Sequence, residues 1–292
     1  MKLATIKWND STSAALVTDD GYAPIRVLPG RADAVDVLSL IRSPLTETEL
    51  TTLAASSVLT GSVTLLAPIL NPPKNIFCVG KNYVEHVKEG AAAEGLTEFT
   101  IPAYPTWFSK PHTALTGHDS GIVYDRAFTS ELDYEGELAI VIGRGGRNIS
   151  ASAALDHVFG YTIVNDVTAR DVQQSHGQWF RGKGADTYAP CGPWIVPAAD
   201  IVDPQNLRIT TAVDGKVRQD DTTKNMIFDI VSLIVDLSQG TTLEPGDIIA
   251  TGTPQGVAWG KTAPGLGFLE VGQQVTVEIE QIGVLSNVVA AL

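Results

Sequence analysis

Three acidic residues on two strand-like segments have the spacing of a metal site. Asp133, Glu135 and Glu137 alternate along residues 132–142, so in a strand they share one face, and Glu135 and Glu137 lie about 6.8 Å apart. Asp166 follows a β-branched run. Like charges on a face that leads into a core are costly unless a cation offsets them. The alternatives are an edge strand with a solvated acidic face and, for Asp166, a helix N-cap.

Carboxylate ligands select a hard cation. Glu135, Glu137 and Asp166 would supply only oxygen atoms, which favours Mg²⁺, Mn²⁺ or Ca²⁺ over Zn²⁺. About three octahedral positions would then remain for water and substrate. The five histidines are scattered, with no His-x-x-x-His pair. The sequence therefore predicts a site for Mg²⁺ or Mn²⁺.

Two further segments carry groups that could move a proton or stabilise charge. His86 and Glu89 are three residues apart, so they can meet on one helix face as an oriented imidazole that acts as a general base. Lys183 lies between two glycines, which let a backbone approach a ligand, and it could stabilise an enolate oxygen. The alternatives are an exposed helix of mixed charge and an ordinary loop lysine.

Polar residues that could bind a substrate follow Asp166 and a later strand. Arg170 and Gln173 share one helical face. Arg170 could bind a carboxylate through two hydrogen bonds, although it could equally be a surface charge. Residues 251–257, Thr-Gly-Thr-Pro-Gln-Gly-Val, form a polar turn whose N–H groups could hold an anion. Nucleophile-elbow, Walker and dinucleotide-binding patterns are missing.

Composition narrows the class of protein. The formal charge of −13 over 292 residues, with no basic run, argues against a nucleic-acid partner. The two cysteines are distant from each other and lie in apolar stretches, which indicates buried thiols in a reducing compartment. The first ten residues lack the pattern of a signal peptide, and no apolar run approaches the ~20 residues of a membrane span. We expect a cytoplasmic protein without a membrane partner.

The elements indicate a β-rich α+β protein with a boundary near residue 70. Residues 71–74, Asn-Pro-Pro-Lys, can continue neither a helix nor a central strand. Before them, strands are expected at 2–8, 14–18 and 22–27, and helices at 32–41 and 45–55, the latter with Ser43 as cap and Pro44 in its first turn. After them, strands are expected at 75–79, 121–124, 134–142, 158–164, 208–213, 216–218, 247–251 and 274–279, and a helix at 226–237. Asp214-Gly215 predicts a two-residue hairpin. Residues 91–104 are either a mobile loop over a site or a surface excursion.

Taken together, these segments resemble the fumarylacetoacetate hydrolase family from about residue 71 onward. The resemblance is carried, in one shared order, by residues 80–89, 108–111, 132–143, 165–173, the loop at Lys183, and residues 192–193, 226–228 and 251–257. It implies a mixed β-roll catalytic domain at residues 71–292, a small N-terminal α+β domain at residues 1–70, and a homodimer. It also implies that Glu135, Glu137 and Asp166 bind Mg²⁺ or Mn²⁺.

The resemblance further implies roles for individual residues. His86 and Glu89 match a pair on a lid that orders over substrate, and residues 91–104 are similar to part of that lid. Lys183 is expected to be catalytic, and substrate contacts are expected from Lys110, Arg170, Gln173, Lys183 and Thr253.

A metal-bound 2-oxo acid can react in several ways at such a site. A divalent cation would act as a Lewis acid and stabilise an enolate at the keto oxygen. Water prepared by His86 and Glu89 would hydrolyse the C–C bond of an acylpyruvate, including fumarylpyruvate. Alternatively, oxaloacetate would lose CO₂, or a proton would move in an isomerase or tautomerase reaction. The intact pair favours C–C cleavage over isomerisation. A non-catalytic, metal-stabilised binding module would need only the three carboxylates, so His86, Glu89 and Lys183 argue against it.

Overall fold

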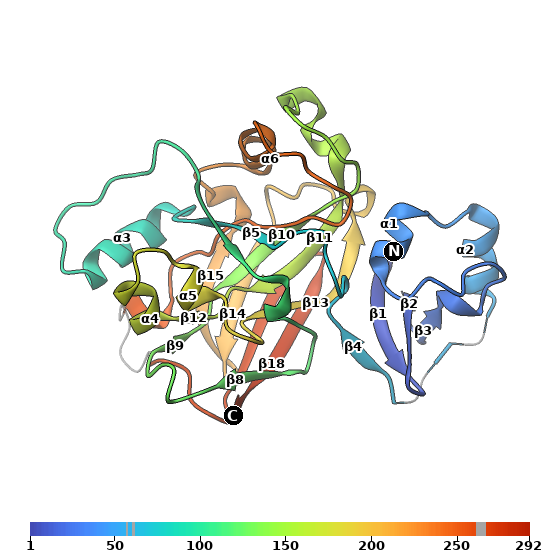
Figure 1. The fold of residues 1–292 in the computed structure, drawn as a ribbon, viewed down its shortest axis with the longest axis horizontal. Helices are drawn as coiled ribbons and strands as arrows, with labels where there is room; N and C mark the ends of the chain where they lie inside the picture. Colours follow the sequence, from blue (N-terminus) through green and yellow to red (C-terminus); the bar gives the residue numbers. More distant parts are fainter. Residues whose placement is uncertain (57, 60–61, 261–266) are drawn as a thin grey trace.

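The computed structural model describes residues 1–56, 58–59, 62–260 and 267–292. Within these residues, most strands belong to two sheets, with short helices between and around them (Figure 1). This is the β-rich α+β fold that the sequence predicts. None of the helices in the described part of the chain is long and apolar enough to cross a membrane.

The larger sheet positions the expected metal site, because it contains Glu137 and one of its strands ends just before Asp166. Its strands lie in the order β3 (Gly21–Pro24), β2 (Ser11–Thr18), β1 (Lys2–Trp8), β13 (Ala189–Pro197), β11 (Val158–Asn165), β10 (Gly136–Ile142), β16 (Ile248–Ala250), β5 (Ile76–Gly80) and β6 (Thr106–Lys110). β4 (Thr64–Leu66) pairs with β1, and β7 (Leu115–Thr116) pairs with β13. A separate pair joins β9 (Leu132–Asp133) to β12 (Thr168–Ala169).

The smaller sheet contains the hairpin that the sequence predicts. Its strands lie in the order β15 (Lys216–Thr222), β14 (Arg208–Val213), β17 (Gln274–Ile279), β18 (Gly283–Ala291) and β8 (Gly121–Tyr124). Val213 pairs with Lys216, and Asp214 and Gly215 between them have φ angles of 50° and 72°. Positive φ at both central residues is what a type I′ hairpin turn requires, so the hairpin is confirmed.

Capping residues set helix boundaries that the hydrophobic pattern alone placed wrongly. α1 (Val37–Arg42) begins after Asp36. The expectation of a helix from residue 32 was therefore wrong for residues 32–36. α2 (Glu47–Ala54) is capped by Thr46, not by Ser43, because Thr46 and Glu49 form a reciprocal capping box. α6 (Ile230–Ser238) begins after Asp229, whose side chain accepts from the Ser232 amide, and not at residue 226.

The expected strand at 134–142 is broken at its start. β10 begins only at Gly136, and Tyr134 and Glu135 separate it from β9. At the break, side chains replace strand partners. The Glu135 amide donates to Asn165 Oδ1 at 3.0 Å, and the Gly136 amide donates to Gln219 Oε1 at 3.0 Å. This irregularity lies at Glu135, the first of the expected metal ligands, which is therefore outside the regular strand pairing.

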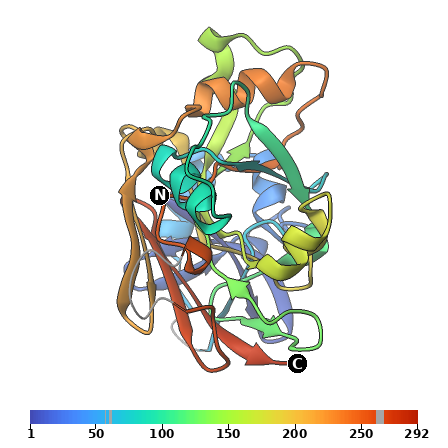
Figure 2. The ribbon, with the colours of Figure 1, turned by 90° about the vertical axis from the view of Figure 1, so that its left-hand side faces the viewer.

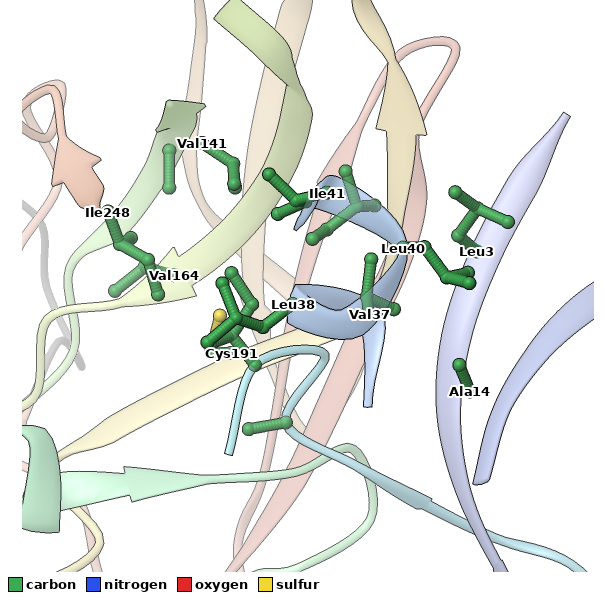
Figure 3. Packing of buried hydrophobic residues seen from close by; sticks show 14 of the residues in the cluster. Leu3, Ala14, Val37, Leu38, Leu40, Ile41, Val141, Val164, Cys191 and Ile248 are labelled. Carbon is green, nitrogen blue, oxygen red and sulfur yellow. The ribbon is translucent and has the colours of Figure 1, made fainter. Parts of the chain in front are cut away.

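Residues 1–70 share both a sheet and a core with the rest of the chain. Leu3 of β1 pairs with Ile195 of β13, and one hydrophobic cluster unites residues of α1, such as Leu38 and Ile41, with Val141 of β10 (Figure 3). Figure 1 shows this N-terminal part beside the β13 edge of the main body. The division into domains 1–70 and 71–292 stays a prediction.

Three helices gather on the side of the molecule that lies away from residues 1–70 (Figures 1 and 2). They are α3 (Val84–Ala93), α4 (Arg170–Ser175) and α5 (Phe180–Lys183). α3 follows β5 of the larger sheet, α4 follows β12, and α5 comes after α4. They carry five of the residues singled out from the sequence, namely His86, Glu89, Arg170, Gln173 and Lys183.

Candidate active site

The three expected metal ligands converge where β10 and β11 end. Gly136 pairs with Asn165, and the Asp166 amide donates to the Glu135 carbonyl at 2.8 Å, so the two strand ends are held together. One carboxylate oxygen from each of Glu135, Glu137 and Asp166 lies within 4.8 Å of the others, and all three residues are buried. We call these residues the carboxylate triad. A solvated edge strand is therefore wrong for Glu135 and Glu137. The N-cap alternative for Asp166 is also wrong, because Ala169 is the N-cap of α4.

Mutual repulsion within the triad makes it a fitting site for a cation. Burial and the neighbouring charges of Asp166 and Glu135 raise the pKa of Glu137 well above its ordinary value. Its carboxylate accepts one hydrogen bond, from the Gly252 amide at 2.8 Å. A divalent cation would remove this repulsion, and the all-oxygen donor set suits a hard ion.

Three buried cations surround the triad. Lys183 Nζ lies 2.7 Å from both Glu135 Oε2 and Asp166 Oδ2. Lys110 Nζ lies 2.6 Å from Asp166 Oδ1, and Arg170 Nη2 lies 2.6 Å from Glu135 Oε1. Burial alone would raise the pKa of Glu135, but Lys183 and Arg170 outweigh it and lower that pKa to about 2. Lys183 and Arg170 are thus not the loop lysine and surface charge of the alternative interpretation.

A cavity of about 600 Å³ opens onto this cluster. Of the residues expected to bind substrate, Arg170, Gln173, Lys183 and Thr253 line it. Gln173 Oε1 accepts from Arg170 Nη1 at 3.2 Å, as their helical spacing predicts. Lys110 is fully buried and contacts Asp166 and the Val167 carbonyl, so it supports a triad residue from behind the cavity wall. Roles in substrate binding stay predictions for all of them.

His86 and Glu89 meet on α3 above the cavity. His86 Nδ1 lies 3.4 Å from Glu89 Oε2, and the imidazole lines the cavity. The Glu89 carboxylate accepts from the Gly256 amide at 3.0 and 3.1 Å. Gly256 in turn accepts from the Tyr134 hydroxyl at 2.9 Å. The helix face that carries the pair is therefore fixed to the residues that flank the triad.

The polar turn at residues 251–257 holds anions that belong to this chain. Its Gly252 and Gly256 amides bind the carboxylates of Glu137 and Glu89. The Thr253 hydroxyl donates to the Gly136 carbonyl at 3.0 Å and accepts from Gln219 Nε2 at 2.8 Å. The turn thus orders both the triad and the His86–Glu89 pair.

Asp133 is a site residue for which the sequence analysis predicts no role. It is fully buried and accepts from Arg170 Nε at 2.9 Å and from the Ala258 and Trp259 amides at 2.9 and 3.0 Å. Trp259 lines the cavity, and its ring lies under Gly90 of α3. The alternation with Glu135 and Glu137 was the available signal, but the break before Gly136 takes Asp133 out of the triad.

Residues 91–104 line the outer part of the cavity. The first three complete α3, and Glu94, Leu96, Glu98, Phe99 and Thr100 of the following loop face the cavity. Lys88 Nζ lies 5.6 Å from the centre of the Phe99 ring. Ordering of this segment on ligand binding stays a prediction.

The family that matches this chain, and several of its relatives, are named as enzymes. The model of the family Fumarylacetoacetate (FAA) hydrolase C-terminal matches residues 75–290. Oxaloacetate tautomerase YisK of Bacillus subtilis is 50% identical over 225 residues, which cover 77% of this chain and 72% of that protein. A fumarylacetoacetate hydrolase structure from Exiguobacterium antarcticum has a TM-score of 0.86 and 38% identity, covering 100% of both chains.

A third relative has been solved with ligands. It is a maleylpyruvate hydrolase from Sphingobium sp. SYK-6 in complex with manganese(II) and pyruvate, with a TM-score of 0.76, 29% identity, and coverage of 100% of this chain and 99% of that one. The activities named for these relatives differ, while the fold is shared. With the carboxylate triad in place and three quarters of the sequence matched, the chain belongs to the fumarylacetoacetate hydrolase family of enzymes.

Proposed function

We propose that this enzyme binds a 2-oxo acid through a divalent cation, Mg²⁺ or Mn²⁺, and transfers a proton at the carbon next to the keto group. The first reaction to test is the keto–enol tautomerisation of oxaloacetate. The observation that carries the proposal is that His86 lines the same cavity as Glu135 and Glu137 of the carboxylate triad. An acid–base group on one side and an enolate-stabilising site on the other is what tautomerisation needs.

The buried cations would polarise the substrate. Glu135, Glu137 and Asp166 would hold the metal, which when bound supplies Lewis-acid stabilisation of an enolate oxygen. Arg170 and Lys183 line the cavity and ion-pair with the triad, so both could donate to a substrate oxygen beside it. Donors fixed in a water-poor site stabilise developing charge without reorganising.

His86 would hold and move the proton. Its Nε2 is the ring nitrogen turned away from the contact with Glu89, so Nε2 would exchange a proton with the substrate carbon while Nδ1 bonds Glu89. Glu89 would orient the ring and stabilise its protonated form. Cavity-lining Phe99 and Trp259 would exclude water from the exchange.

The relative at 50% identity changes the order of the candidate reactions. From the sequence alone, the His86–Glu89 pair favoured hydrolysis of an acylpyruvate. YisK, named as an oxaloacetate tautomerase, supports proton transfer without cleavage as the first candidate. Hydrolytic C–C cleavage is the second candidate, because the same pair could activate water and one structural relative is named a maleylpyruvate hydrolase. Decarboxylation of oxaloacetate would use the same enolate. We also propose that the enzyme works as a homodimer in the cytoplasm.

The test is a reaction panel with purified protein. Enol-oxaloacetate would be added to the enzyme, and loss of enol absorbance followed with Mg²⁺, with Mn²⁺ and with excess EDTA. Pyruvate release from oxaloacetate and from acylpyruvates would be measured in parallel. We expect metal-dependent tautomerisation faster than either release, and its loss in Asp166→Ala. Pyruvate release as the faster reaction would instead establish the second candidate or decarboxylation. Full activity in EDTA, or no turnover of any substrate, would refute the proposal.

A further inference from the structure

Lys81 is a cavity-lining cation to which neither the triad nor the His86–Glu89 pair gives a role. It follows Gly80, the last residue of β5, and precedes α3. Its side chain is exposed and lines the same cavity as His86 and Lys183. Among the described residues, no carboxylate lies within ion-pair distance of it, whereas Arg170 and Lys183 are both paired with triad carboxylates.

The backbone holds Lys81 in a conformation that most residues avoid. Its φ is 59°, in the left-handed region that is strained for a non-glycine residue. The next residue, Asn82, fixes this conformation. Its side chain donates to the Thr251 and Phe228 carbonyls at 2.7 and 3.0 Å and accepts from the Phe228 amide at 2.8 Å. Such residues cluster at functional sites, where the surrounding structure maintains the strain.

The strand register sets the span between Lys81 and the metal site. Gly252 bonds the Glu137 carboxylate through its amide, and a Cβ at Gly252 would lie 3.0 Å from the Val79 carbonyl oxygen. Gly252 therefore lies between β10 and the end of β5. Two interstrand spacings place the end of β5 roughly 10 Å from Glu137. A substrate chelated at the triad would extend across this span toward the Lys81 ammonium.

We propose that Lys81 binds the distal carboxylate of a 2-oxo dicarboxylic acid whose keto and adjacent carboxylate oxygens lie at the triad. This inference rests on the proposed function and adds the residue that recognises the far end of the substrate. Glu94 and Glu98 of the segment 91–104 also line the cavity. A second substrate carboxylate would be repelled there unless a cation offset them, and Lys81 is the cavity-lining ammonium that the described carboxylates leave free.

Two ligands of equal length test this assignment. 2-Oxoglutarate and 2-oxopentanoate differ only in a terminal carboxylate against a terminal methyl group. Their dissociation constants would be measured by calorimetry with Mg²⁺ present, for wild type, Lys81→Met, Lys81→Arg and the distant surface variant Lys216→Met. We expect Lys81→Met to weaken 2-oxoglutarate about 10- to 100-fold, the range of a charge-assisted hydrogen bond. Binding of 2-oxopentanoate should not change, Lys81→Arg should restore most of the loss, and Lys216→Met should match wild type.

The outcomes separate this inference from the proposed function. Equal weakening of both ligands by Lys81→Met would show that Lys81 acts on the cavity or on the segment 91–104, for example through Glu94 or Glu98, and would overturn the assignment. Unchanged binding of both ligands would also overturn it, with the 2-oxo acid site intact. If neither ligand binds wild type with Mg²⁺ or Mn²⁺, the proposed function itself fails.

Discussion

Lys183 lies 2.7 Å from Glu135 and 2.7 Å from Asp166, so one buried ammonium spans two members of the carboxylate triad. A divalent cation at the triad must share these same carboxylates. The pKa of Lys183 is raised because the two carboxylates outweigh the effect of burial, so the lysine stays charged. Metal and lysine therefore compete for the same electrostatic partners.

This competition can be measured with Lys183→Met. We expect the metal-free variant to lose about 3–5 kcal/mol of unfolding free energy, because two buried carboxylates lose a paired cation. Mn²⁺ should stabilise the variant more than it stabilises wild type, since Lys183 no longer competes for Glu135 and Asp166, while turnover falls. Denaturant unfolding with EDTA and with Mn²⁺ measures both effects, and Lys216→Met is the control for loss of a surface charge. Equal stabilisation of wild type and variant by Mn²⁺ would contradict the competition.

A pH-dependent instability should reside in Glu137. Burial and repulsion by Asp166 and Glu135 raise its pKa in the folded protein. A carboxyl with a raised folded-state pKa stabilises the fold below its unfolded pKa of about 4.3, and this stability is lost as pH rises through the folded pKa. In EDTA, Glu137→Gln should therefore be more stable than wild type at neutral pH, and the advantage should disappear near pH 4. Melting temperatures across this range check it, and a constant difference at every pH would refute the cause.

The fit between Gly260 and Glu89 predicts an effect on catalysis without loss of the metal. A Cβ at Gly260 would lie 2.2 Å from Glu89 Cγ and 2.3 Å from its Oε1. Gly260→Ala should displace the carboxylate from His86 and lower kcat about 100-fold, the lower end of the range for an acid–base group. Metal affinity should stay at the wild-type value. Gly267→Ala, where no heavy atom lies within 4 Å of the added Cβ, is the matched control. Loss of activity in both variants, or in neither, would contradict the mechanism.

Strand periodicity was sufficient to predict that Glu135 and Glu137 share one face, whereas Asp166 was placed by the end of its β-branched run and by the family resemblance. Residues two apart share a face in any strand, and a buried face with repeated acids needs compensation whatever its partners are. The Asp214-Gly215 turn was predicted for a similar reason, because its conformation depends on residues that are adjacent in sequence. Helix ends failed where a capping side chain competed with the hydrophobic pattern, as at Thr46 and Asp229.

Long-range partners could not be predicted from one sequence. Lys110 meets Asp166 across 56 residues, and Glu89 meets Gly256 across 167. The residues around Lys110 and Glu89 in the sequence do not indicate which distant residue each will contact. β13 was missed because Pro190, Pro193 and Pro197 weaken its local strand signal, while its pairing with β1, β7 and β11 comes from distant segments. The position of Lys110 behind Asp166 follows from this same non-local packing.

Residues 85–104 should become more protected when a substrate analogue binds. The loop after α3 lines the cavity, yet Leu96 and Tyr104 are 55% and 77% exposed, so few contacts hold it. Amide hydrogen exchange there should slow when oxalate is added with Mg²⁺, because the ligand would complete the inner cavity wall. Exchange at β17 should not change and provides the internal reference. Identical rates in the segment with and without saturating oxalate would refute closure over the ligand.

The last prediction assigns the chemistry of His86 by comparing two reactions. If its imidazole exchanges the proton at the substrate carbon, His86→Ala should lower kcat/KM for oxaloacetate tautomerisation by about 10²- to 10⁴-fold. If the imidazole only activates water, tautomerisation should survive and any acylpyruvate hydrolysis should be lost. Glu89→Gln keeps an acceptor for the Gly256 amide but removes the charge beside the ring, so it should give a smaller loss in the same reaction as His86→Ala. Both reactions should be measured at saturating Mg²⁺, with oxalate binding as a check that the metal site is intact. A His86→Ala enzyme with wild-type rates in both reactions would remove His86 from the mechanism, because no role in proton transfer tolerates loss of the ring.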